Sequence, residues 1–341
     1  MLIEKYLEVV VKQRGSDLHI SAGLPPVVRI DGQLQRMDVP ALKPEEVELL
    51  LFPMLNKEQR RKLEQDWELD FSYGVQGLSR FRVNIYKDRG NYAAAFRVIA
   101  SKVPSFKELG LSDTVRKIAE KPRGLVLVTG PTGSGKSTTL AAMINYINEN
   151  RSEHILTIED PVEFVHTSKV SIIHQRELGM DTRSFANALK SALREDPDII
   201  LVGEMRDLET ISLALTASET GHLVLGTLHT SSASQTIDRI IDVFPPHSQN
   251  QIRTQLSSVL KGVISQTLIP VAEGGGRVAA TEILIGIDAV GNLIRQDKAH
   301  QIDTIMQANG AMGMHTLNSD LERLVREGTI TKEAALKVSS N

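Results

Sequence analysis

The chain has 341 residues and a net charge of −3, and 41% of its residues are hydrophobic and 24% charged. This length exceeds the size at which one core remains efficient, so we expect a globular protein of about two domains. The sequence holds no cysteine, which excludes disulfides, thiol nucleophiles and cysteine-ligated zinc. Lysine and arginine are spread along the chain, which argues against the broad basic surface that nucleic-acid-binding proteins use.

The sequence predicts no membrane span and no leader peptide. No apolar run approaches the roughly 20 residues that cross a bilayer. The opening stretch "MLIEKYLEVVVKQRG" mixes charges into its apolar positions and lacks the uninterrupted block of a signal peptide. We therefore expect a cytoplasmic protein.

Residues 1–100 are predicted to form a small α+β domain with an antiparallel sheet. An opening amphipathic helix is expected to bury Leu2, Tyr6, Val9 and Val10. The helical segments between the strands read "KPEEVELLLFPML" and "NKEQRRKLEQD". Asp31-Gly32 forms a hairpin turn within the second of the alternating segments, which read "DLHIS", "VVRIDGQLQRM", "LDFSYG", "RFRVNIY" and "AAAFRVI".

Residues 101–112 are predicted to link this domain to a larger one over 113–341. Strand and helix alternate from residue 124 onward, and the strands are apolar throughout. This alternation of apolar strands with helices predicts a mostly parallel sheet covered by helices on both faces. Beyond it we expect a helical stretch over residues 247–268, a hairpin around residues 274–276 and further helices.

The stretch "GPTGSGKST" matches the phosphate-binding pattern G-x-x-x-x-G-K-[ST] between a predicted strand and a predicted helix. Its glycines let backbone amides face a polyphosphate, and the helix N-terminus adds positive potential. Lys136 is placed to reach the β and γ phosphates of ATP, and the Ser137 hydroxyl to ligate Mg2+. The alternative is a glycine-rich turn that happens to precede a helix. The nucleotide-binding candidates are Gly130, Pro131, Thr132, Gly133, Ser134, Gly135, Lys136, Ser137 and Thr138.

Two further strand ends carry carboxylates. In "ILTIEDPVE", Pro161 interrupts the strand and leaves Glu159, Asp160 and Glu163 at the carboxyl edge of the sheet, where α/β proteins bind ligands. A solvated acidic turn is the alternative. In "IILVGEMRD", Glu204 ends a strand that is apolar throughout, as a magnesium-holding acid in a nucleotide site does.

Histidines and arginines complete the candidate set. In "TGHLVLGTLH", His222 precedes a strand and has an ordinary core or capping role as its alternative. His229 ends that strand, where it could sense the γ-phosphate. Phosphoryl transfer also needs positive charge, which "RFRVN" offers because alternation places Arg80 and Arg82 on one face; Arg97 follows on a later strand. A solvent-facing basic strand is the alternative for these arginines.

Taken together, the motifs resemble the secretion ATPase superfamily (GspE/PilT family), and within it the type IV pilus retraction ATPases. The resemblance covers nearly the whole chain. It implies a PAS-like N-terminal domain followed by a RecA-like P-loop ATPase domain, six chains in a ring, and ATP bound between domains. The motifs that carry it are "SDLHISAGLPP", "RIDG", "RFRVN", "GPTGSGKSTT", "TIEDPVEF", "HQRELG", "LREDPDIILVGEMRDLET" and "TGHLVLGTLH".

The resemblance also implies roles for the candidate residues. Glu163 orients or deprotonates the attacking water, and Glu159 is a second candidate for this base. Glu204 holds magnesium through a water, and His229 reports on the γ-phosphate. The arginines that the small domain brings to the nucleotide are Arg80, Arg82 and Arg97.

The implied function is a hexameric motor that acts on an inner-membrane platform protein at the cytoplasmic face of the pilus base, without direct contact to nucleic acid. The absence of a four-cysteine zinc module favours retraction over extension. The usual retraction motif "AIRNLIRE" reads "AVGNLIRQ" here, with Gly291 and Gln296 departing from it. The alternatives are an accessory, PilU-like ATPase that works beside a paralogue and, from another class, a RecA-like nucleic-acid motor.

Overall fold

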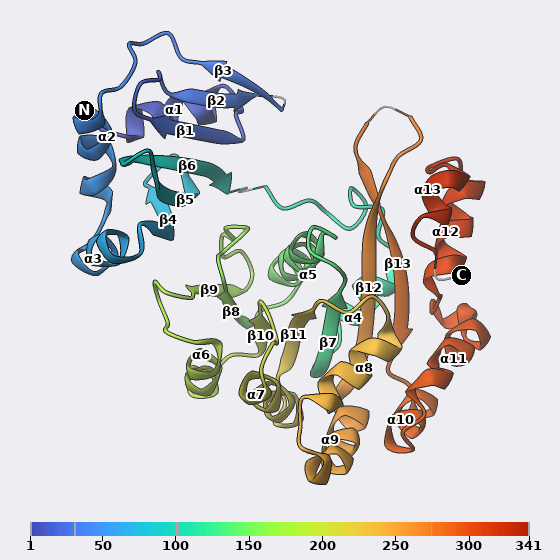
Figure 1. Ribbon diagram of the computed structural model, residues 1–341. Coiled ribbons are helices and arrows are strands. Elements are labelled where there is room, and N and C mark those ends of the chain that lie inside the picture. Colours follow the sequence, from blue (N-terminus) through green and yellow to red (C-terminus); the bar gives the residue numbers. More distant parts are fainter. Residues whose placement is uncertain (1, 31, 100–101, 274, 340–341) are drawn as a thin grey trace. The chain divides into compact units, whose positions relative to one another are not determined.

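The computed structural model describes residues 2–30, 32–99, 102–273 and 275–339 (Figure 1). The chain divides into two compact units, one made of Met1–Lys102 with Pro161–Val165 and the other of Val103–Asp160 with His166–Asn341. Residues 100 and 101, at the start of the predicted linker, lie outside the described residues. No helix in the described ranges is both long enough and apolar enough to cross a bilayer.

The first unit is the predicted α+β domain. Its sheet is antiparallel, with the strand order β3-β2-β1-β6-β5-β4. The helices are α1 (Glu4–Lys12), α2 (Pro44–Leu51) and α3 (Lys57–Asp66), with the 3-10 turn η1 (Phe52–Met54) after α2. The strands are β1 (Asp17–Ser21), β2 (Val27–Ile30), β3 (Gln33–Arg36), β4 (Glu68–Val75), β5 (Ser79–Asp88) and β6 (Asn91–Ile99).

Helix α1 and the β2–β3 hairpin of the first unit can be compared with the predictions. The buried face of α1 holds Tyr6, Leu7 and Val10, together with Ile3 just before the helix. Leu2 is 61% exposed, so its predicted place in the core is wrong; it precedes the helix and does not share its periodicity. The strands β2 and β3 pair with Ile30 opposite Gln33. Asp31, half of the predicted turn between them, lies outside the described residues.

The second unit contains a seven-stranded sheet in the order β13-β12-β7-β11-β10-β8-β9. All neighbouring strands are parallel except β12 and β13, which confirms the predicted mostly parallel sheet. The strands are β7 (Gly124–Thr129), β8 (His154–Glu159), β9 (Ile172–Glu177), β10 (Ile199–Val202), β11 (Leu223–Leu228), β12 (Leu260–Pro270) and β13 (Arg277–Ile285).

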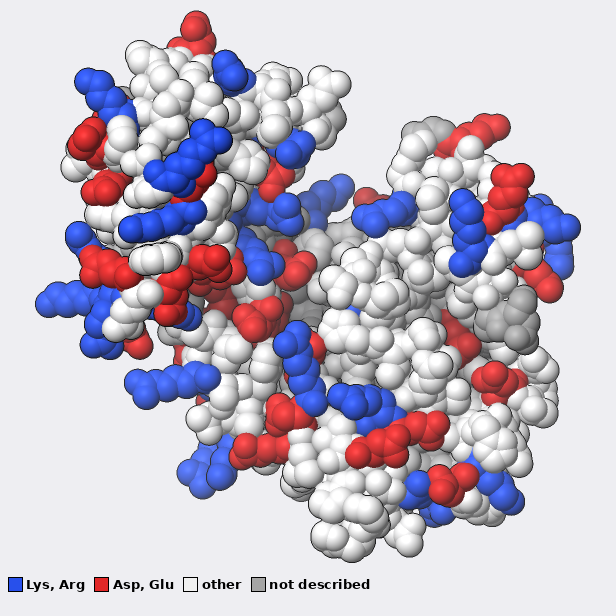
Figure 2. Space-filling view, in the orientation of Figure 1, with Lys and Arg blue, Asp and Glu red and all other residues white. Residues whose placement is uncertain are grey.

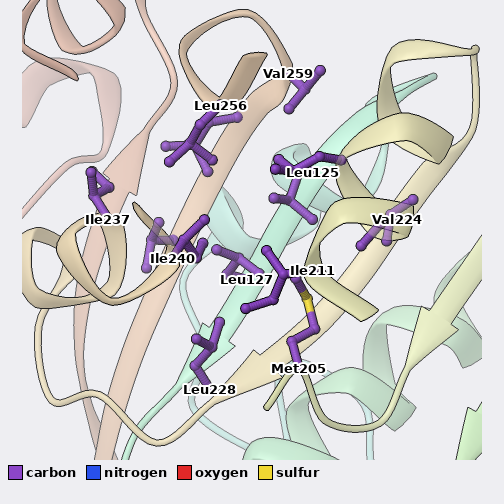
Figure 3. Packing of buried hydrophobic residues seen from close by; sticks show 14 of the residues in the cluster. Leu125, Leu127, Met205, Ile211, Val224, Leu228, Ile237, Ile240, Leu256 and Val259 are labelled. Atoms are coloured by element: carbon purple, nitrogen blue, oxygen red, sulfur yellow. The ribbon is translucent and has the colours of Figure 1, made fainter. Parts of the chain in front are cut away.

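Helices cover both faces of this sheet because side chains alternate between them (Figure 1). Val126 and Val128 pack with helices α4 and α5, whereas Leu125 and Leu127 pack with α6 to α11. Figure 3 shows the hydrophobic cluster that contains Leu125 and Leu127, in which Leu127 lies beside Met205 and Ile211. The helices are α4 (Asp113–Ala119), α5 (Lys136–Asn150), α6 (Phe185–Ala192), α7 (Leu208–Glu219), α8 (Ala233–Asp242), α9 (Pro246–Val259), α10 (Asp288–Arg295), α11 (Ile302–Ala308), α12 (Leu317–Arg326) and α13 (Lys332–Leu336).

The predicted helix over residues 247–268 is wrong in its second half. Helix α9 ends at Val259, and Leu260–Pro270 forms β12. The reason is tertiary: β12 pairs with β7 on one side and with β13 on the other, so its backbone hydrogen bonds are satisfied in a sheet. A short apolar run of this kind does not distinguish a buried strand from a buried helix by its periodicity. Strand β9 and helix α4 were not predicted.

Leu256→Ala should destabilise the second unit by about 2–5 kcal/mol, because Leu256 on α9 is 0% exposed and its removal leaves a cavity in a packed core. We expect a fall of several degrees in melting temperature by scanning calorimetry. Leu336→Ala is the matched control, since Leu336 on α13 is 61% exposed. Equal melting temperatures for the two variants would contradict the core assignment.

Candidate active site

Four adjacent strands of the second unit carry the predicted site residues at one edge of the sheet. The strands β7, β11, β10 and β8 are neighbours and run parallel, so their carboxyl ends coincide. Gly130 follows β7, His229 follows β11, Glu204 lies two residues beyond β10, and Glu159 ends β8. The structure therefore brings the phosphate-binding loop, His229, Glu204 and Glu159 to the ligand-binding edge of an α/β sheet.

The loop between β7 and α5 has the backbone of a phosphate cradle. Gly130, Gly133 and Gly135 all have positive φ angles, of 143°, 77° and 88°, which residues with a Cβ atom rarely adopt. At Gly130 a Cβ atom would also lie 2.2 Å from the backbone oxygen of Gln266. Glycine is thus required there for both conformation and space. The loop ends at the N-terminus of α5, where unpaired amides and the helix dipole favour an anion.

The side chains of the loop fit a polyphosphate as well. Lys136 donates from Nζ to the carbonyl oxygens of Gly130 (2.8 Å) and Pro131 (3.0 Å), which places its ammonium over the cradle. Ser137 is exposed, whereas Ser134 is buried. The Ser134 hydroxyl has no hydrogen-bond partner among the described residues. The remaining exposed members of the loop are Pro131, Thr132 and Gly133, and Thr138 is half-buried.

Glu204 is held in place by the residue that follows it. Met205 is buried, its N–H donates to the Thr227 carbonyl on β11 (3.0 Å), and its side chain reaches the core shown in Figure 3. A Cβ atom at Gly226 would lie 2.4 Å from the Met205 sulfur, so the glycine inside β11 makes room for this anchor. The strand end is thereby locked, and the neighbouring Glu204 points away from the core.

The carboxylate of Glu204 contacts two basic side chains. His229 Nε2 lies 2.9 Å from Oε1 of Glu204, and Arg206 Nε donates to the same oxygen. Partial burial raises the pKa of Glu204, but the hydrogen bond and charge of Arg206, together with those of His229, outweigh burial and lower it. Glu204 is therefore ionised at neutral pH, which is the form that ligates a cation.

The described residues contain no group of three or more His, Cys, Asp or Glu side chains that could hold a metal by themselves. Magnesium does not require one, because it is commonly held by one or two carboxylates or hydroxyls together with substrate phosphates and water. Ser137 and Glu204 fit that donor set. The residues of this edge are thus compatible with a magnesium–nucleotide complex.

Glu159 and Glu163, which belong to the same sequence motif, fall in different units of the structure. Glu159 accepts from Thr157 Oγ1 (2.6 Å) and from Gln175 Nε2 (3.2 Å) at the end of β8. Glu163 is exposed and belongs to the segment Pro161–Val165 of the first unit. Glu159 is thus engaged within the second unit. Glu163 remains the prediction for the base.

The predicted arginines lie on β5 and β6 of the first unit. Arg80 and Arg82 alternate with the buried Phe81, as expected, and Arg82 is exposed. Arg97 on β6 stands directly opposite Arg82 in the antiparallel ladder. Like charges in that position repel each other.

Arg97 also has an acidic neighbour within the first unit. It donates from Nε to Oδ1 of Asp17 (2.9 Å). Burial raises the pKa of Asp17, but hydrogen bonds from Ser16 and Arg97 outweigh burial and lower it, so the carboxylate offsets part of the arginine charge. Arg97 therefore has an acidic partner on the neighbouring strand β1.

The sequence left the role of His222 undecided and did not indicate that Gln266 belongs to the site. His222 contacts the Ala217 carbonyl through Nδ1 (2.9 Å), so it caps the C-terminus of α7, which is the capping alternative. Gln266 on β12 is 3% exposed and contacts the phosphate-binding loop. Its segment was interpreted as helix, which hid it; a strand assignment next to β7 is the signal that would have found it.

Comparisons with known proteins agree with this geometry. The type II/IV secretion system protein family matches residues 1–337. "Type IV pilus retractation ATPase PilT" of Pseudomonas aeruginosa is 55% identical over 98% of this chain and 97% of its own length. "Twitching motility protein" of Neisseria gonorrhoeae is also 55% identical, over 93% and 84%. "Type IV pilus ATPase PilU" of P. aeruginosa is 40% identical, over 98% and 88%.

A crystal structure of the pilus retraction motor PilT with bound ADP superposes with a TM-score of 0.92. It is 50% identical in sequence, and the match covers 100% of this chain and 98% of that one. The match therefore spans both units of this chain. This chain therefore belongs to the type II/IV secretion system protein family.

Proposed function

We propose that this chain is the subunit of a homohexameric motor that hydrolyses ATP to drive type IV pilus retraction. The observation that carries the proposal is the complete phosphate-binding loop at the same sheet edge as the Glu204–His229 pair, in a chain that resembles a retraction ATPase over its full length. Removal of pilin subunits from the pilus base, and hence twitching motility, follows as the cellular outcome.

In this proposal the loop binds the phosphates of ATP. Lys136 contacts the β and γ phosphates, and the amides of the loop and of the first turn of α5 donate to phosphate oxygens. Ser137 and Glu204 would hold magnesium. Magnesium, when bound, offsets the negative charge that develops on the phosphate oxygens. His229 contacts an oxygen of Glu204, which supports its proposed role in responding to the γ-phosphate.

The remaining steps need a base and positive charge, which come mainly from the first unit. Glu163 serves as the base that orients or deprotonates the attacking water, with Glu159 as the second candidate. Arg80, Arg82 and Arg97 supply positive charge to the transferred phosphoryl group, as phosphoryl transfer requires. Closure of the small domain on ATP would then be coupled to hydrolysis. That coupling converts chemistry into movement.

The proposed partners are other copies of the chain in a ring and an inner-membrane platform protein, at the cytoplasmic face of the membrane. Gly291, one of the two departures from the retraction motif, is buried within α10. A Cβ atom there would lie 3.2 Å from the Ser257 carbonyl oxygen on α9. The glycine therefore lets two helices approach closely where retraction ATPases usually carry arginine.

The two alternatives are less well supported. A PilU-like accessory ATPase, which works beside a paralogue, is disfavoured because the identity to PilU is lower than that to PilT. A RecA-like nucleic-acid motor would need a basic channel. On the face shown in Figure 2, lysines and arginines are interspersed with acidic residues.

The purified chain is expected to hydrolyse ATP in the presence of Mg2+, and to do so as a hexamer. Turnover and oligomer mass should be measured on the same preparation, with EDTA as the metal-removal control. Addition of single-stranded DNA should leave the rate unchanged. A strong stimulation by DNA would favour the nucleic-acid motor instead.

Glu204→Gln should retain most nucleotide binding and lower kcat by about 100-fold or more, because the neutral amide no longer supports the metal. Binding of a fluorescent ADP analogue and steady-state turnover measure the two effects. Glu209→Gln, an exposed acid in the first turn of α7, is the matched control and should behave as wild type. Wild-type turnover in Glu204→Gln would contradict the metal assignment.

Arg82→Ala should lower kcat by about 100-fold if its charge stabilises the transferred phosphoryl group. The fold should survive, since Arg82 is exposed and its loss relieves repulsion with Arg97. Arg61→Ala on α3 removes an exposed arginine elsewhere in the same unit and serves as the control. Unchanged turnover with an unchanged melting temperature would remove Arg82 from the site.

A further inference from the structure

Gln266 lies beside the phosphate-binding loop. Strand β12 runs parallel to β7, with Ser265 opposite Thr129, the last residue of β7. The hydroxyls of these two residues are 2.8 Å apart, which fixes the register at this point. Gln266 is the next residue, level with the start of the loop, and it is 3% exposed. A buried amide must satisfy its polar atoms within the protein.

Both ends of the Gln266 amide contact the loop and the helix that follows it. Nε2 donates to the Ser134 carbonyl (2.7 Å), and Oε1 accepts from the Thr139 hydroxyl (2.9 Å) in the first turn of α5. Because one end donates and the other accepts, the amide has a single favourable orientation. The backbone oxygen of Gln266 packs against Gly130 as well. Gln266 thus contacts Gly130 at the start of the loop, Ser134 within it and Thr139 in the first turn of α5.

The hydrogen bond to Ser134 sets the direction of a peptide unit. In a planar trans peptide the C=O and the following N–H point in opposite directions. Since the Ser134 carbonyl points to Gln266, the N–H of Gly135 points away from β12. Gly135 is the residue before α5 and has a left-handed backbone, so its amide belongs to the phosphate cradle.

We propose that Gln266 is a positioning residue of the nucleotide site, which holds the Ser134–Gly135 peptide with its N–H presented to the phosphates. The inference rests on the proposed ATPase function. It assigns to β12 a part of the site that lies outside the phosphate-binding motif. Its consequence is that Gln266 tunes the affinity for nucleotide in addition to supporting the fold.

The test uses the isosteric variant Gln266→Met, which keeps the length of the side chain and removes both hydrogen bonds. We expect the Kd of a fluorescent ADP analogue and the KM for ATP to rise about tenfold, with a smaller change in kcat. A rise in KM at nearly constant kcat is the signature of a lost interaction that the bound substrate and the transition state share equally. Tenfold corresponds to about 1.4 kcal/mol.

Thr139→Val provides a second, independent variant. It removes the hydroxyl that orients the Gln266 amide, so it should weaken nucleotide binding in the same direction. In the Gln266→Met background it should add little, because the two residues act through one interaction. Additive effects of the two changes on Kd would overturn the proposal. This variant also keeps the proposal falsifiable if Gln266→Met fails to fold.

The matched control is Thr281→Val on β13, where the hydroxyl is likewise buried and contacts Asp320 (3.2 Å) and His315 (3.0 Å). It should lower the melting temperature and leave the Kd unchanged. An equal loss of affinity in this control would show that general loosening explains the effect, and so would overturn the proposal.

Two further outcomes separate this inference from the proposed function. If the unmodified protein is active and Gln266→Met has the same Kd and KM as that protein, the inference is overturned and the proposed function stands. A wild-type protein that neither binds the ADP analogue nor hydrolyses ATP would overturn the proposed function, and the inference with it.

Discussion

The parallel pairing of β7, β11, β10 and β8 is the constraint on which the rest of the second unit depends. These strands are buried on both faces, so their backbone groups pair with each other and most of their side chains are apolar. Polar chemistry is therefore confined to the strand ends. Since the strands are parallel, those ends meet at one edge, and residues far apart in sequence become neighbours there.

Close packing behind the edge makes the polar groups rigid. Two glycines are needed for close contacts: Gly130 admits the backbone of Gln266, and Gly226 admits the sulfur of Met205. Met205 in turn holds Glu204, and Gln266 holds the Ser134–Gly135 peptide. The phosphate cradle is thus supported by a buried residue of the neighbouring strand β12, and the acid by the buried residue that follows it in the chain. A site built in this way loses little entropy when a ligand binds.

Each unit contains a carboxylate that is paired with basic side chains. Glu204 is paired with Arg206 and His229, and Arg97 with Asp17. In both cases the pKa of the carboxyl is lowered, so the acids remain ionised at neutral pH. In the proposed site, a metal that binds Glu204 would compete with Arg206 and His229, which already contact its carboxylate.

The sequence by itself determined the phosphate-binding loop, the acid at the end of β10, the histidine at the end of β11 and the alternating face of β5. Each depends on a local pattern whose meaning does not change with the surroundings. Only the tertiary structure decided that residues 260–268 are a strand, because that strand exists through pairing with β7, more than a hundred residues earlier in the chain. For the same reason Gln266 could not be recognised from the sequence. Leu2 was misplaced since helix periodicity holds only inside a helix, and the position where α1 begins was not predictable to one residue.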